Sequence, residues 1–358
     1  MNAIAKPVSL KFLSEHLGLS PTTVSLVVNN SPRARSIPQA TKDRVLEAAR
    51  TFNYRPNYFA RSLSNQRSFT VAVVVPEISE GYGASVLSAI ESRLTREGYL
   101  YFVVSHRWSA ELIEETPQVL MERGVEGFIL VNMPLEHSLP VPVVNIGGRK
   151  KLKSVTNLLL DNRRAGRLAL EYLVQIGHRR IAFFKGHPES ADTEDRWQGI
   201  HEAAEQLGVA IEPELTVQLQ RRPFPPGPPV PEEGYMYAQK LLARKVEFTA
   251  LFAFNDISAI GAMSAFRDAG LSVPEDVSIV GFDDIQAAAF LNPPLTTVRQ
   301  PLRRMGDLAA KILLRRIRQG DTEPEDISVQ PELVIRESAS APPAQPWRAR
   351  HLPESMKT

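Results

Sequence analysis

The ten residues Ser20-Pro21-Thr22-Thr23-Val24-Ser25-Leu26-Val27-Val28-Asn29 decide how the start of this chain is interpreted. Ser20 suits an N-cap because its hydroxyl can accept a hydrogen bond from a free backbone N–H, and Pro21 suits the first helical position. Val24, Val27 and Val28 recur at helical spacing. The stretch therefore predicts a helix with a buried valine face and a polar outer face made by Thr22, Ser25, Leu26 and Asn29.

A shorter helix is expected before this one, over residues 9–17, and a third is expected over residues 39–53. Gly18 lies in the turn between the first two helices, where it is free to adopt a positive φ. Two helices joined by a short glycine-containing turn form a helix-turn-helix unit, whose second helix enters the major groove of DNA. A helical hairpin in an ordinary globular domain would show the same pattern, so further evidence is needed.

The charge distribution supplies that evidence. The chain has a net charge of +2, yet its first 68 residues contain ten Lys and Arg and only three acidic residues. The rest of the chain contains 32 basic and 37 acidic residues. A basic head on an acidic body suits phosphate binding by the head alone. Because the charge coincides with the helix-turn-helix pattern, it favours nucleic-acid binding over a merely solvated basic surface.

Length and composition set further limits. The chain has 358 residues, of which 43% are hydrophobic and none is cysteine. This length predicts two or three domains, and the lack of cysteine excludes disulfides and cysteine–metal sites. We expect no cofactor and no metal. There is no apolar run long enough for a membrane span and no signal-peptide pattern. We therefore expect a cytoplasmic protein, associated with the nucleoid when bound to DNA.

From residue 69 onward, β-rich runs alternate with amphipathic helices. Continuous apolar runs suit strands that are buried on both faces, and strand–helix alternation is typical of parallel sheets wound on both sides. In such sheets ligands bind beyond the carboxyl ends of the strands. The strands are expected at 71–75, 101–104, 128–131, 141–144, 158–160, 181–184, 251–254 and 277–280. The helices are expected at 84–97, 111–123, 163–176, 197–207, 235–243, 258–269 and 304–318.

These patterns predict a multi-domain chain. It has an all-α helix-turn-helix DNA-binding domain (1–54), a hinge helix or linker (55–68), an α/β body of two doubly wound parallel-sheet subdomains (69–336) and a disordered tail (337–358). The N-subdomain is expected at about 69–165 and 299–326, and the C-subdomain at about 166–298 and 327–336. Six prolines make 223–231 a stiff, extended loop of unknown role.

The order of these parts resembles the lactose/galactose repressor (LacI/GalR) family of bacterial transcriptional regulators, over residues 8–336. The head carries the resemblance at 19–29, 41–45 and 53–57, and the hinge carries it at Ala60 and Leu63. The body carries it at Asp161-Asn162, Gly177-His178-Arg179, Arg196 with Gly199, Phe254-Asn255-Asp256, 280–284 and 294–300.

The resemblance implies a repressor that binds a palindromic operator as a homodimer. Its body would be a periplasmic-binding-protein-like sensor, and its hinge would become helical on DNA. Leu63 would then wedge into the minor groove, as apolar side chains do in other DNA-bending proteins, although it could be an ordinary linker leucine. The residues expected to contact DNA are Ser20, Pro21, Thr22, Thr23, Ser25, Leu26, Asn29, Arg33, Arg35, Tyr54, Arg55, Asn57, Ala60 and Leu63.

The resemblance also implies an effector cleft lined by Asp161, Arg196, Asn255, Asp283 and Gln300. Carboxylates, amides and guanidinium groups suit a sugar or sugar derivative, because they accept from and donate to hydroxyls. Candidate apolar walls are Trp197, Phe224 and Phe282. Other roles remain open: Asp256 could cap a helix, Asp283 and Asp284 could end a strand, and Trp197 could belong to the core.

The chain departs from the family pattern in several places. Leu26 stands where arginine is frequent, so base reading there would be apolar, for instance against a thymine methyl. The basic loop with Arg33 and Arg35 is longer than usual, and the proline-rich loop is atypical, which affects the ligand class. The tail has no leucine heptad, so we expect a dimer rather than a tetramer.

Other classes of protein fit less well. An enzyme is not expected, because there is no nucleophile elbow, P-loop or metal triad. A solute receptor that does not bind DNA would share the body but would not need a basic head. A regulator controlled by a protein partner, such as a phosphocarrier, would show the same sequence features. Calorimetry with sugars, against affinity capture from lysate, would separate a regulator controlled by a sugar from one controlled by a protein partner.

Overall fold

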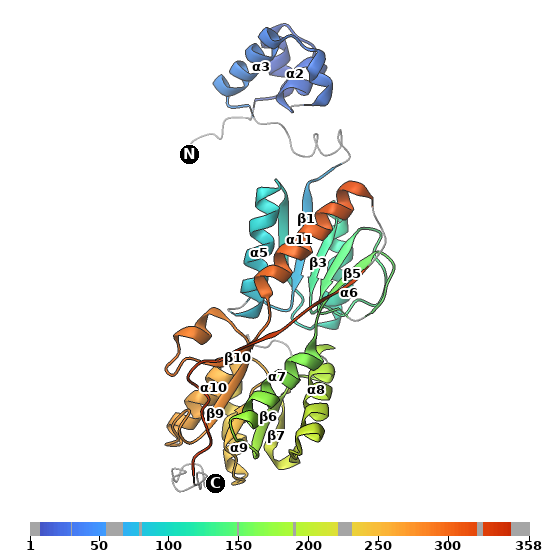
Figure 1. Cartoon of the computed structure of the whole chain (residues 1–358). Coiled ribbons are helices and arrows are strands. Elements are labelled where there is room, and N and C mark those ends of the chain that lie inside the picture. The colour runs from blue at the N-terminus through green and yellow to red at the C-terminus, as the bar shows by residue number, and fades with distance from the viewer. Residues whose placement is uncertain are drawn as a thin grey trace. The chain divides into compact units, whose positions relative to one another are not determined.

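The computed structural model describes residues 8–29, 31–54, 67–78, 81–148, 150–188, 191–220, 231–320 and 325–344. The chain divides into two compact units, Met1–Ser68 and Phe69–Thr358, called the head and the body below (Figure 1). Most of the expected hinge and proline-rich loop, and the end of the expected tail, lie outside the described residues. Within the described part of the chain, no helix is both long and apolar enough to span a membrane.

The head consists of α1 (Leu10–Leu17), α2 (Pro21–Val28), the short 3-10 helix η1 (Pro32–Ser36) and α3 (Gln39–Thr51). Gly18 ends α1 with a φ of 64°, which confirms the expected glycine turn. The three α-helices meet around a small core made by Leu13, Val24, Val27, Val45 and Ala48. The helix-turn-helix pattern in the sequence is therefore confirmed.

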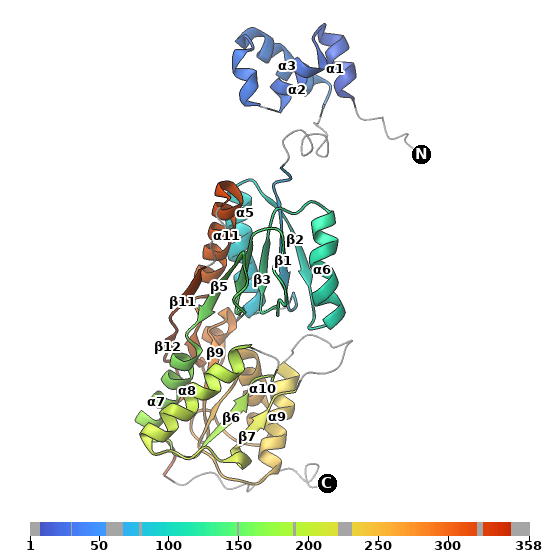
Figure 2. The same cartoon turned by 90° about the vertical axis from the view of Figure 1, so that its right-hand side faces the viewer.

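The N-subdomain of the body is built on a parallel six-stranded sheet in the order β11-β5-β4-β3-β1-β2. Helices α5 (Tyr82–Arg96) and α11 (Leu302–Gln319) pack together on one face of this sheet, and α6 (Ala110–Glu122) covers the other face (Figure 2). Its strands are β1 (Thr70–Val75), β2 (Leu100–Ser105), β3 (Phe128–Val131), β4 (Val143–Ile146), β5 (Val155–Leu160) and β11 (Asp326–Val329).

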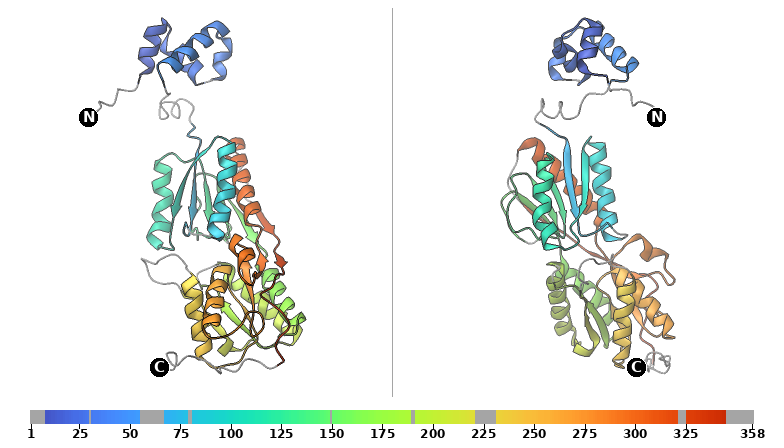
Figure 3. Two further views of the ribbon diagram at one scale, coloured as in Figure 1. Left: turned by 90° about the vertical axis from the view of Figure 1, so that its left-hand side faces the viewer. Right: turned by 180° about the vertical axis from the view of Figure 1, so that it is seen from behind.

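The C-subdomain repeats this plan in a six-stranded sheet of the order β12-β10-β9-β8-β6-β7, in which β12 pairs antiparallel. The pair α7 (Asn162–Gln175) and α8 (Ala191–Leu207) covers one face, and α9 (Pro231–Ala243) with α10 (Asp256–Asp268) covers the other (Figure 3). Its strands are β6 (Ile181–Lys185), β7 (Thr216–Gln218), β8 (Ala250–Phe252), β9 (Ser278–Asp283), β10 (Thr296–Arg299) and β12 (Glu332–Val334); two 3-10 helices, η2 (Pro213–Leu215) and η3 (Gln286–Phe290), lie in its loops.

Both sheets have the same doubly wound strand order, β2-β1-β3-β4-β5 in the first and β7-β6-β8-β9-β10 in the second. In this order the chain reverses its winding direction between the first and third strands. Ligands of such folds bind beyond the carboxyl ends of the strands near that point. The topology therefore directs attention to the residues that follow β1, β3, β6, β8 and β9.

Three crossovers join the two subdomains: from β5 to α7, from β10 to α11, and from β11 to β12. The first and third crossovers lie a few residues from the expected subdomain boundaries, which were placed between residues 165 and 166 and between residues 326 and 327. Helix α7 begins at Asn162 and packs against α8, while β11 continues to Val329 in pairing with β5. The start of a helix and a four-residue edge strand show only weak periodicity in the sequence. This explains why the two expected boundaries differ by a few residues from the observed crossovers.

The expected disordered tail begins too early. Ser338 and Ala339 are buried, and the Ile279 backbone N–H donates to the Ser338 carbonyl oxygen at 2.7 Å. The His178 ring lies 2.9 Å from the Ser340 carbonyl oxygen. The prediction of disorder is therefore wrong for residues 337–344, which pack against the C-subdomain although their sequence is rich in alanine, serine and proline.

Candidate DNA-binding head and effector site

The start of α2 is built as the sequence predicts. The Ser20 hydroxyl accepts a hydrogen bond from the Thr23 backbone N–H at 3.1 Å, and Pro21 occupies the first helical turn. The Ser20 and Thr23 hydroxyls also lie 2.9 Å apart. Val24 and Val27 are buried in the head core. These contacts fix the rotation of α2 about its axis and leave Thr22 exposed.

The remaining predicted side chains of α2 are partly covered. Ser25, Leu26 and Asn29 are half-buried, and the Asn29 side-chain amide donates to the Ser25 hydroxyl at 3.2 Å. This hydrogen bond holds the end of the helix and the amide in one arrangement. The outer face of α2 therefore offers one fully exposed hydroxyl, Thr22, beside a more rigid polar and apolar strip.

Arg33 and Arg35 lie on η1, which the sequence analysis expected to be a loop. Ala34 between them is buried, so it anchors η1 while both arginines stay exposed. Tyr54 is half-buried against the head core. The predicted hinge contacts Arg55, Asn57, Ala60 and Leu63 all lie outside the described residues.

In the body, Arg196 on α8 is 5% exposed, and its guanidinium donates hydrogen bonds to a backbone carbonyl oxygen and to a side-chain amide oxygen. Its Nη1 donates to the Phe254 carbonyl oxygen at 2.7 Å. Its Nε and Nη2 donate to Asn162 Oδ1 at 3.3 and 3.1 Å. The guanidinium carbon lies 3.3 Å from the centroid of the Phe282 ring and 4.8 Å from that of Phe254. Such packing fixes the orientation of the guanidinium fork.

Asp283 is the last residue of β9 and lies near Arg196. Gln300 Nε2 donates to Asp283 Oδ1 at 2.6 Å, and both side chains are buried. The backbone of Asp283 has a φ of 112°, in a region that side-chain-bearing residues rarely adopt. The structure therefore brings together three of the five predicted effector residues, Arg196, Asp283 and Gln300.

The other two predicted effector residues cap helices. Asp161 Oδ1 accepts from the Arg164 backbone N–H at 3.0 Å at the start of α7. Asn255 Oδ1 accepts from the Ser258 backbone N–H at 2.8 Å and takes part in a capping box at the start of α10. Each follows a strand, but one oxygen of each side chain is used for a cap.

Several polar residues of this region were not predicted. Asn162 receives the Arg196 hydrogen bonds and donates through Nδ2 to Asp192 Oδ1 at 2.8 Å. Tyr82, at the start of α5 in the N-subdomain, lies close to Asn132 and in the electrostatic field of Asp192 and Asp283. Asn162 belongs to the Asp161-Asn162 motif but was not predicted to line the site, and the sequence held no signal for Asp192, Tyr82 and Asn132.

Burial dominates the electrostatics of this cluster. It raises the pKa of Asp283 to about 7, although the Arg196 charge and the Gln300 hydrogen bond act in the opposite direction. It lowers the pKa of the Arg196 guanidinium to about 10, against the attraction of Asp192 and Asp283. Burial also raises the pKa of the Tyr82 hydroxyl, and the carboxylates of Asp192 and Asp283 add to this rise. Strongly shifted groups that share a cleft are typical of functional sites.

Hydrogen bonds show the structural roles of the neighbouring carboxylates Asp256 and Asp284. Asp256 does not cap α10; it is buried and accepts from the Thr297 hydroxyl at 2.6 Å and from the Ile285 backbone N–H at 2.9 Å. Asp284 accepts from Arg336 Nη2 at 2.6 Å and from Arg299 Nε at 2.7 Å. Both residues therefore stabilise the turn that presents Asp283.

The aromatic candidates have different positions. The Phe282 ring lies under the Arg196 guanidinium. Trp197 is half-buried, packs edge-on against Phe183 at 5.6 Å between ring centroids, and lines a small cavity of about 10 Å³ with Arg196. Phe224 lies outside the described residues. Trp197 thus contacts both the core and the edge of the candidate site.

Comparison with known proteins identifies the family. The model for bacterial regulatory proteins of the lacI family matches residues 15–57, and the model for a periplasmic binding protein-like domain matches residues 170–339. The HTH-type transcriptional repressor PurR of Histophilus somni (strain 129Pt) is 32% identical over 341 residues, which cover 92% of this chain and 98% of the relative. The chain belongs to the LacI family of bacterial regulatory proteins. It is a DNA-binding transcriptional repressor with a ligand-binding body, and the family resemblance and fold class inferred from the sequence are confirmed.

Two solved structures show the same LacI-family architecture over nearly the whole chain. The lac repressor dimer bound to operator and the anti-inducer ONPF is 26% identical, with a TM-score of 0.80, and the match covers 94% of this chain and 100% of that one. The complex of the transcriptional regulator CelR with cellobiose is 29% identical, with a TM-score of 0.66, and the match covers 93% and 100% of the two chains.

Proposed function

We propose that this repressor binds a palindromic operator as a homodimer and that a sugar or sugar derivative, bound at Arg196 and Asp283, controls its affinity for DNA. The observation that carries the effector part is the cluster of buried Arg196 and Asp283 with half-buried Asp192 and Tyr82 beyond the strand ends. Burying charged groups is costly unless they are paired or bind a partner. A cluster of this kind suits a polar ligand.

The hydrogen-bonding capacity of the cluster favours a polyol. A guanidinium has five N–H donors, and Arg196 uses one from each of its three nitrogens on Phe254 and Asn162. Two N–H groups of Arg196 therefore remain for a ligand. Asp283 uses Oδ1 to accept from Gln300, which leaves Oδ2 as an acceptor. A hydroxyl both donates and accepts, so neighbouring hydroxyls of a sugar match this donor–acceptor pair.

Of the two solved structures above, the complex of CelR with cellobiose supports a sugar effector. The lac repressor structure contains the anti-inducer ONPF and the CelR structure contains cellobiose. The half-buried ring of Phe254 beside Arg196 adds apolar surface, which suits the C–H face of a sugar ring, whereas Phe282 is fully buried beneath the guanidinium. Asp161 and Asn255 flank the cluster, and each has a second polar atom beyond the one used in its cap.

The DNA-binding part of the proposal assigns base reading to α2 and phosphate contacts to the residues around it. Thr22 is an exposed hydroxyl side chain in the first turn of α2, where recognition helices meet base edges. Leu26 and the Ser25–Asn29 pair lie further along the same helix. Exposed Arg33 and Arg35 on η1 suit phosphate oxygens, and Leu63 is proposed as the minor-groove wedge.

Calorimetric titration of the full-length protein with lactose, cellobiose and D-ribose tests the effector assignment. We expect heat of binding with at least one sugar, and loss of that heat in Arg196→Met. Arg267→Met is the matched control, because Arg267 is an exposed arginine on α10 paired with Asp268. Binding that survives Arg196→Met unchanged would remove the cleft assignment. No sugar binding, together with capture of a phosphocarrier protein from lysate, would replace the sugar by a protein partner.

A further inference from the structure

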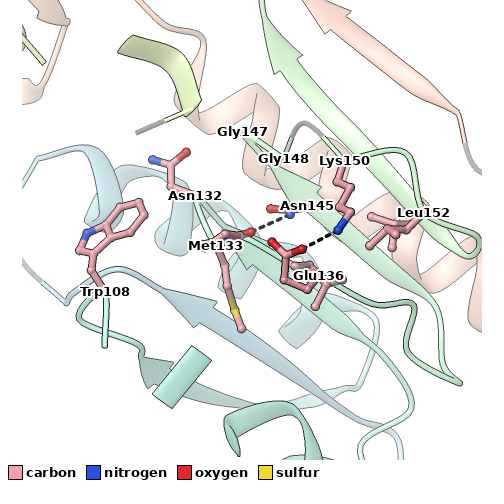
Figure 4. Close-up of a pocket in the computed structure, with 12 residues that line it drawn as sticks. Trp108, Asn132, Met133, Glu136, Asn145, Gly147, Gly148, Lys150 and Leu152 are labelled. Carbon is pink, nitrogen blue, oxygen red and sulfur yellow. Dashed lines mark hydrogen bonds and ion pairs between the residues drawn. The ribbon is translucent and has the colours of Figure 1, made fainter. Parts of the chain in front are cut away.

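A separate pocket of about 200 Å³ lies within the N-subdomain, at the carboxyl ends of β2, β3 and β4 (Figure 4). Every residue that lines it lies between Trp108 and Val155, so none belongs to the C-subdomain. Its lining contains none of Arg196, Asp283, Asp192 and Tyr82, although Asn132 at its edge lies close to Tyr82. Its walls are formed by the loops that follow the three strands.

The polar centre of this pocket is Asn145 on β4. Its side chain is 3% exposed, and its Nδ2 donates to the Met133 carbonyl oxygen at 3.0 Å. Within the described part of the chain, Asn145 Oδ1 has no hydrogen-bond donor. A buried amide oxygen without a donor destabilises the fold, because it has lost its hydrogen bonds to water without replacement. A ligand with a hydroxyl or N–H group at this position would remove that cost.

Two glycines keep the wall beside Asn145 open. Gly147 has a φ of 79°, and a Cβ atom there would meet the side-chain oxygen of Asn132. A Cβ atom on Gly148 would meet the side-chain amide of Asn145. Because neither glycine has a side chain, the amide groups of Asn132 and Asn145 can approach the pocket. A larger residue at either glycine position would collide with one of these amides.

The rest of the lining is apolar, and its mouth is electrically balanced. Lys150 and Glu136 form an exposed ion pair at the edge of the pocket (Figure 4). Trp108 faces the pocket from the β2 side and is held by a hydrogen bond from its backbone N–H to His106 Nδ1 at 3.1 Å. The other apolar walls are Met133, Pro134, Leu135, Leu152 and Val155.

We propose that this pocket is a second ligand site, which binds an uncharged molecule of about one ring with at least one hydroxyl or N–H donor. The volume limits the ligand to a single ring, because drug-sized ligands occupy pockets of roughly 300–1,000 Å³. The balanced mouth gives no preference for either charge. The Trp108 indole offers a flat surface for a ring, and Asn145 Oδ1 accepts the donor. A single sugar ring and a heterocyclic base both meet this description.

Asn132 gives the second site a path to the first. Its side chain lies at the edge of the pocket and close to Tyr82, which in turn lies near the charged groups Arg196, Asp192 and Asp283. A ligand that draws the Asn132 amide toward itself changes the environment of Tyr82. The second site would thereby alter the affinity of the cleft for its effector, and linkage requires the reverse effect to be equal.

The test uses full-length protein labelled with 5-fluorotryptophan and observed by fluorine NMR. Trp108 reports on this pocket and Trp197 reports on the cleft, and Trp→Phe variants assign the signals. D-Glucose and D-ribose form one arm, and adenine and uracil form the other. We expect at least one of the four to shift the Trp108 signal saturably, and the responding arm identifies the chemical class.

The variants decide whether the shift comes from the pocket. Asn145→Leu removes the acceptor and should raise the dissociation constant about tenfold, in line with the loss of one buried hydrogen bond. Leu152→Trp fills the pocket from its half-exposed rim and should abolish the shift without changing the core strands. It serves as the second test if Asn145→Leu folds poorly.

The proposal is overturned if no compound of either arm shifts the Trp108 signal, or if the shift persists with unchanged affinity in Leu152→Trp. Failure of the cleft assignment is a different result, because it concerns the Trp197 signal. A ligand that moves the Trp197 signal alone, and loses this effect in Arg196→Met, binds only in the cleft and also overturns the second site for that compound class.

Discussion

Asp283 is a buried, hydrogen-bonded carboxyl group among the predicted effector residues. It is presented by a turn with positive φ, held by Gln300, and faced by Arg196. Its pKa of about 7 lies above the ordinary value of 3.8, because burial disfavours the carboxylate. The native state therefore binds this proton more tightly than the unfolded chain.

The raised pKa predicts how the stability of the body depends on pH. The stabilising contribution of protonated Asp283 is fully present below about pH 4 and is lost as the pH rises through about 7. At 1.36 kcal/mol per pKa unit, the loss has an upper bound of roughly 4 kcal/mol. Urea unfolding followed by tryptophan fluorescence, which reports only the body because the head has no tryptophan, measures it. Asp283→Asn should flatten this pH dependence between 4 and 7; an unchanged profile contradicts the assigned pKa.

Residues of the head differ in what they read. Thr22→Ala should change which bases are preferred, because Thr22 is exposed on the outer face of α2. Arg35→Ala should weaken binding to all sequences about equally and reduce the salt slope by about one unit, as expected for a lost phosphate contact. Competition binding with a panel of operator variants at several salt concentrations separates these effects. An unchanged base preference in Thr22→Ala would show that α2 is wrongly placed as the reading helix.

The head has a hydrophobic core of its own, separate from the cores of the body. Leu13 on α1 is fully buried in the head core, among side chains of α2 and α3. Leu13→Ala should destabilise the head by about 2–5 kcal/mol and abolish operator binding, while the tryptophan-reported unfolding of the body stays unchanged. Phe12→Ala is the control, because Phe12 on the same helix is 43% exposed. A shift of the body transition in Leu13→Ala would mean that the two units do not unfold independently.

The sequence predicted elements well where their periodicity was long. The strand at 128–131 was predicted with its observed bounds, and α7 and α10 begin within two residues of expectation. The strands β7, β10, β11 and β12 were missed, because polar residues interrupt their short apolar runs, whereas β3 is apolar throughout. Helix α8 begins at Ala191, six residues before the expected start at Trp197, since its polar first turns contain no apolar repeat.

The candidate site was predicted less completely than the fold. Arg196, Asp283 and Gln300 were found through motif resemblance, and all three come together. The residues that orient them, Asn162 and Asp192, lie thirty positions apart and meet only in the folded chain. Spacing along the sequence carries no information about such a pair, because the contact depends on how α7 and α8 pack.

At the scale of the whole molecule, the proposed dimer requires an apolar contact face. The edge strand β2 exposes Leu100 by 65% and Phe102 by 40%. Leu100→Glu should convert the dimer to a monomer and weaken operator binding at least tenfold, because a buried charge would replace an apolar contact. Sedimentation equilibrium measures the change, with the exposed Leu207→Glu on α8 as the matched control. A variant that stays dimeric contradicts the use of β2.

The hinge connects operator binding to the rest of the molecule in the proposed mechanism. Leu63→Ala should weaken specific operator binding by about 1–3 kcal/mol, the range typical of a lost specific contact, while non-specific affinity changes little. Fluorescence anisotropy with an operator and a scrambled duplex of equal length gives both values. Equal loss on the two duplexes would support an ordinary linker leucine instead of a wedge.

Selection of duplexes from a random DNA pool by the purified full-length protein tests the central claim most directly. We predict enrichment of a palindrome whose two half-sites are related by a two-fold axis, with a flexible pyrimidine–purine step at its centre. The selection is run without and with the sugar identified by calorimetry, and one condition should enrich the palindrome more strongly. Enrichment of a single unpaired half-site in both conditions, or of no sequence in either, would contradict a dimeric, effector-controlled operator-binding protein.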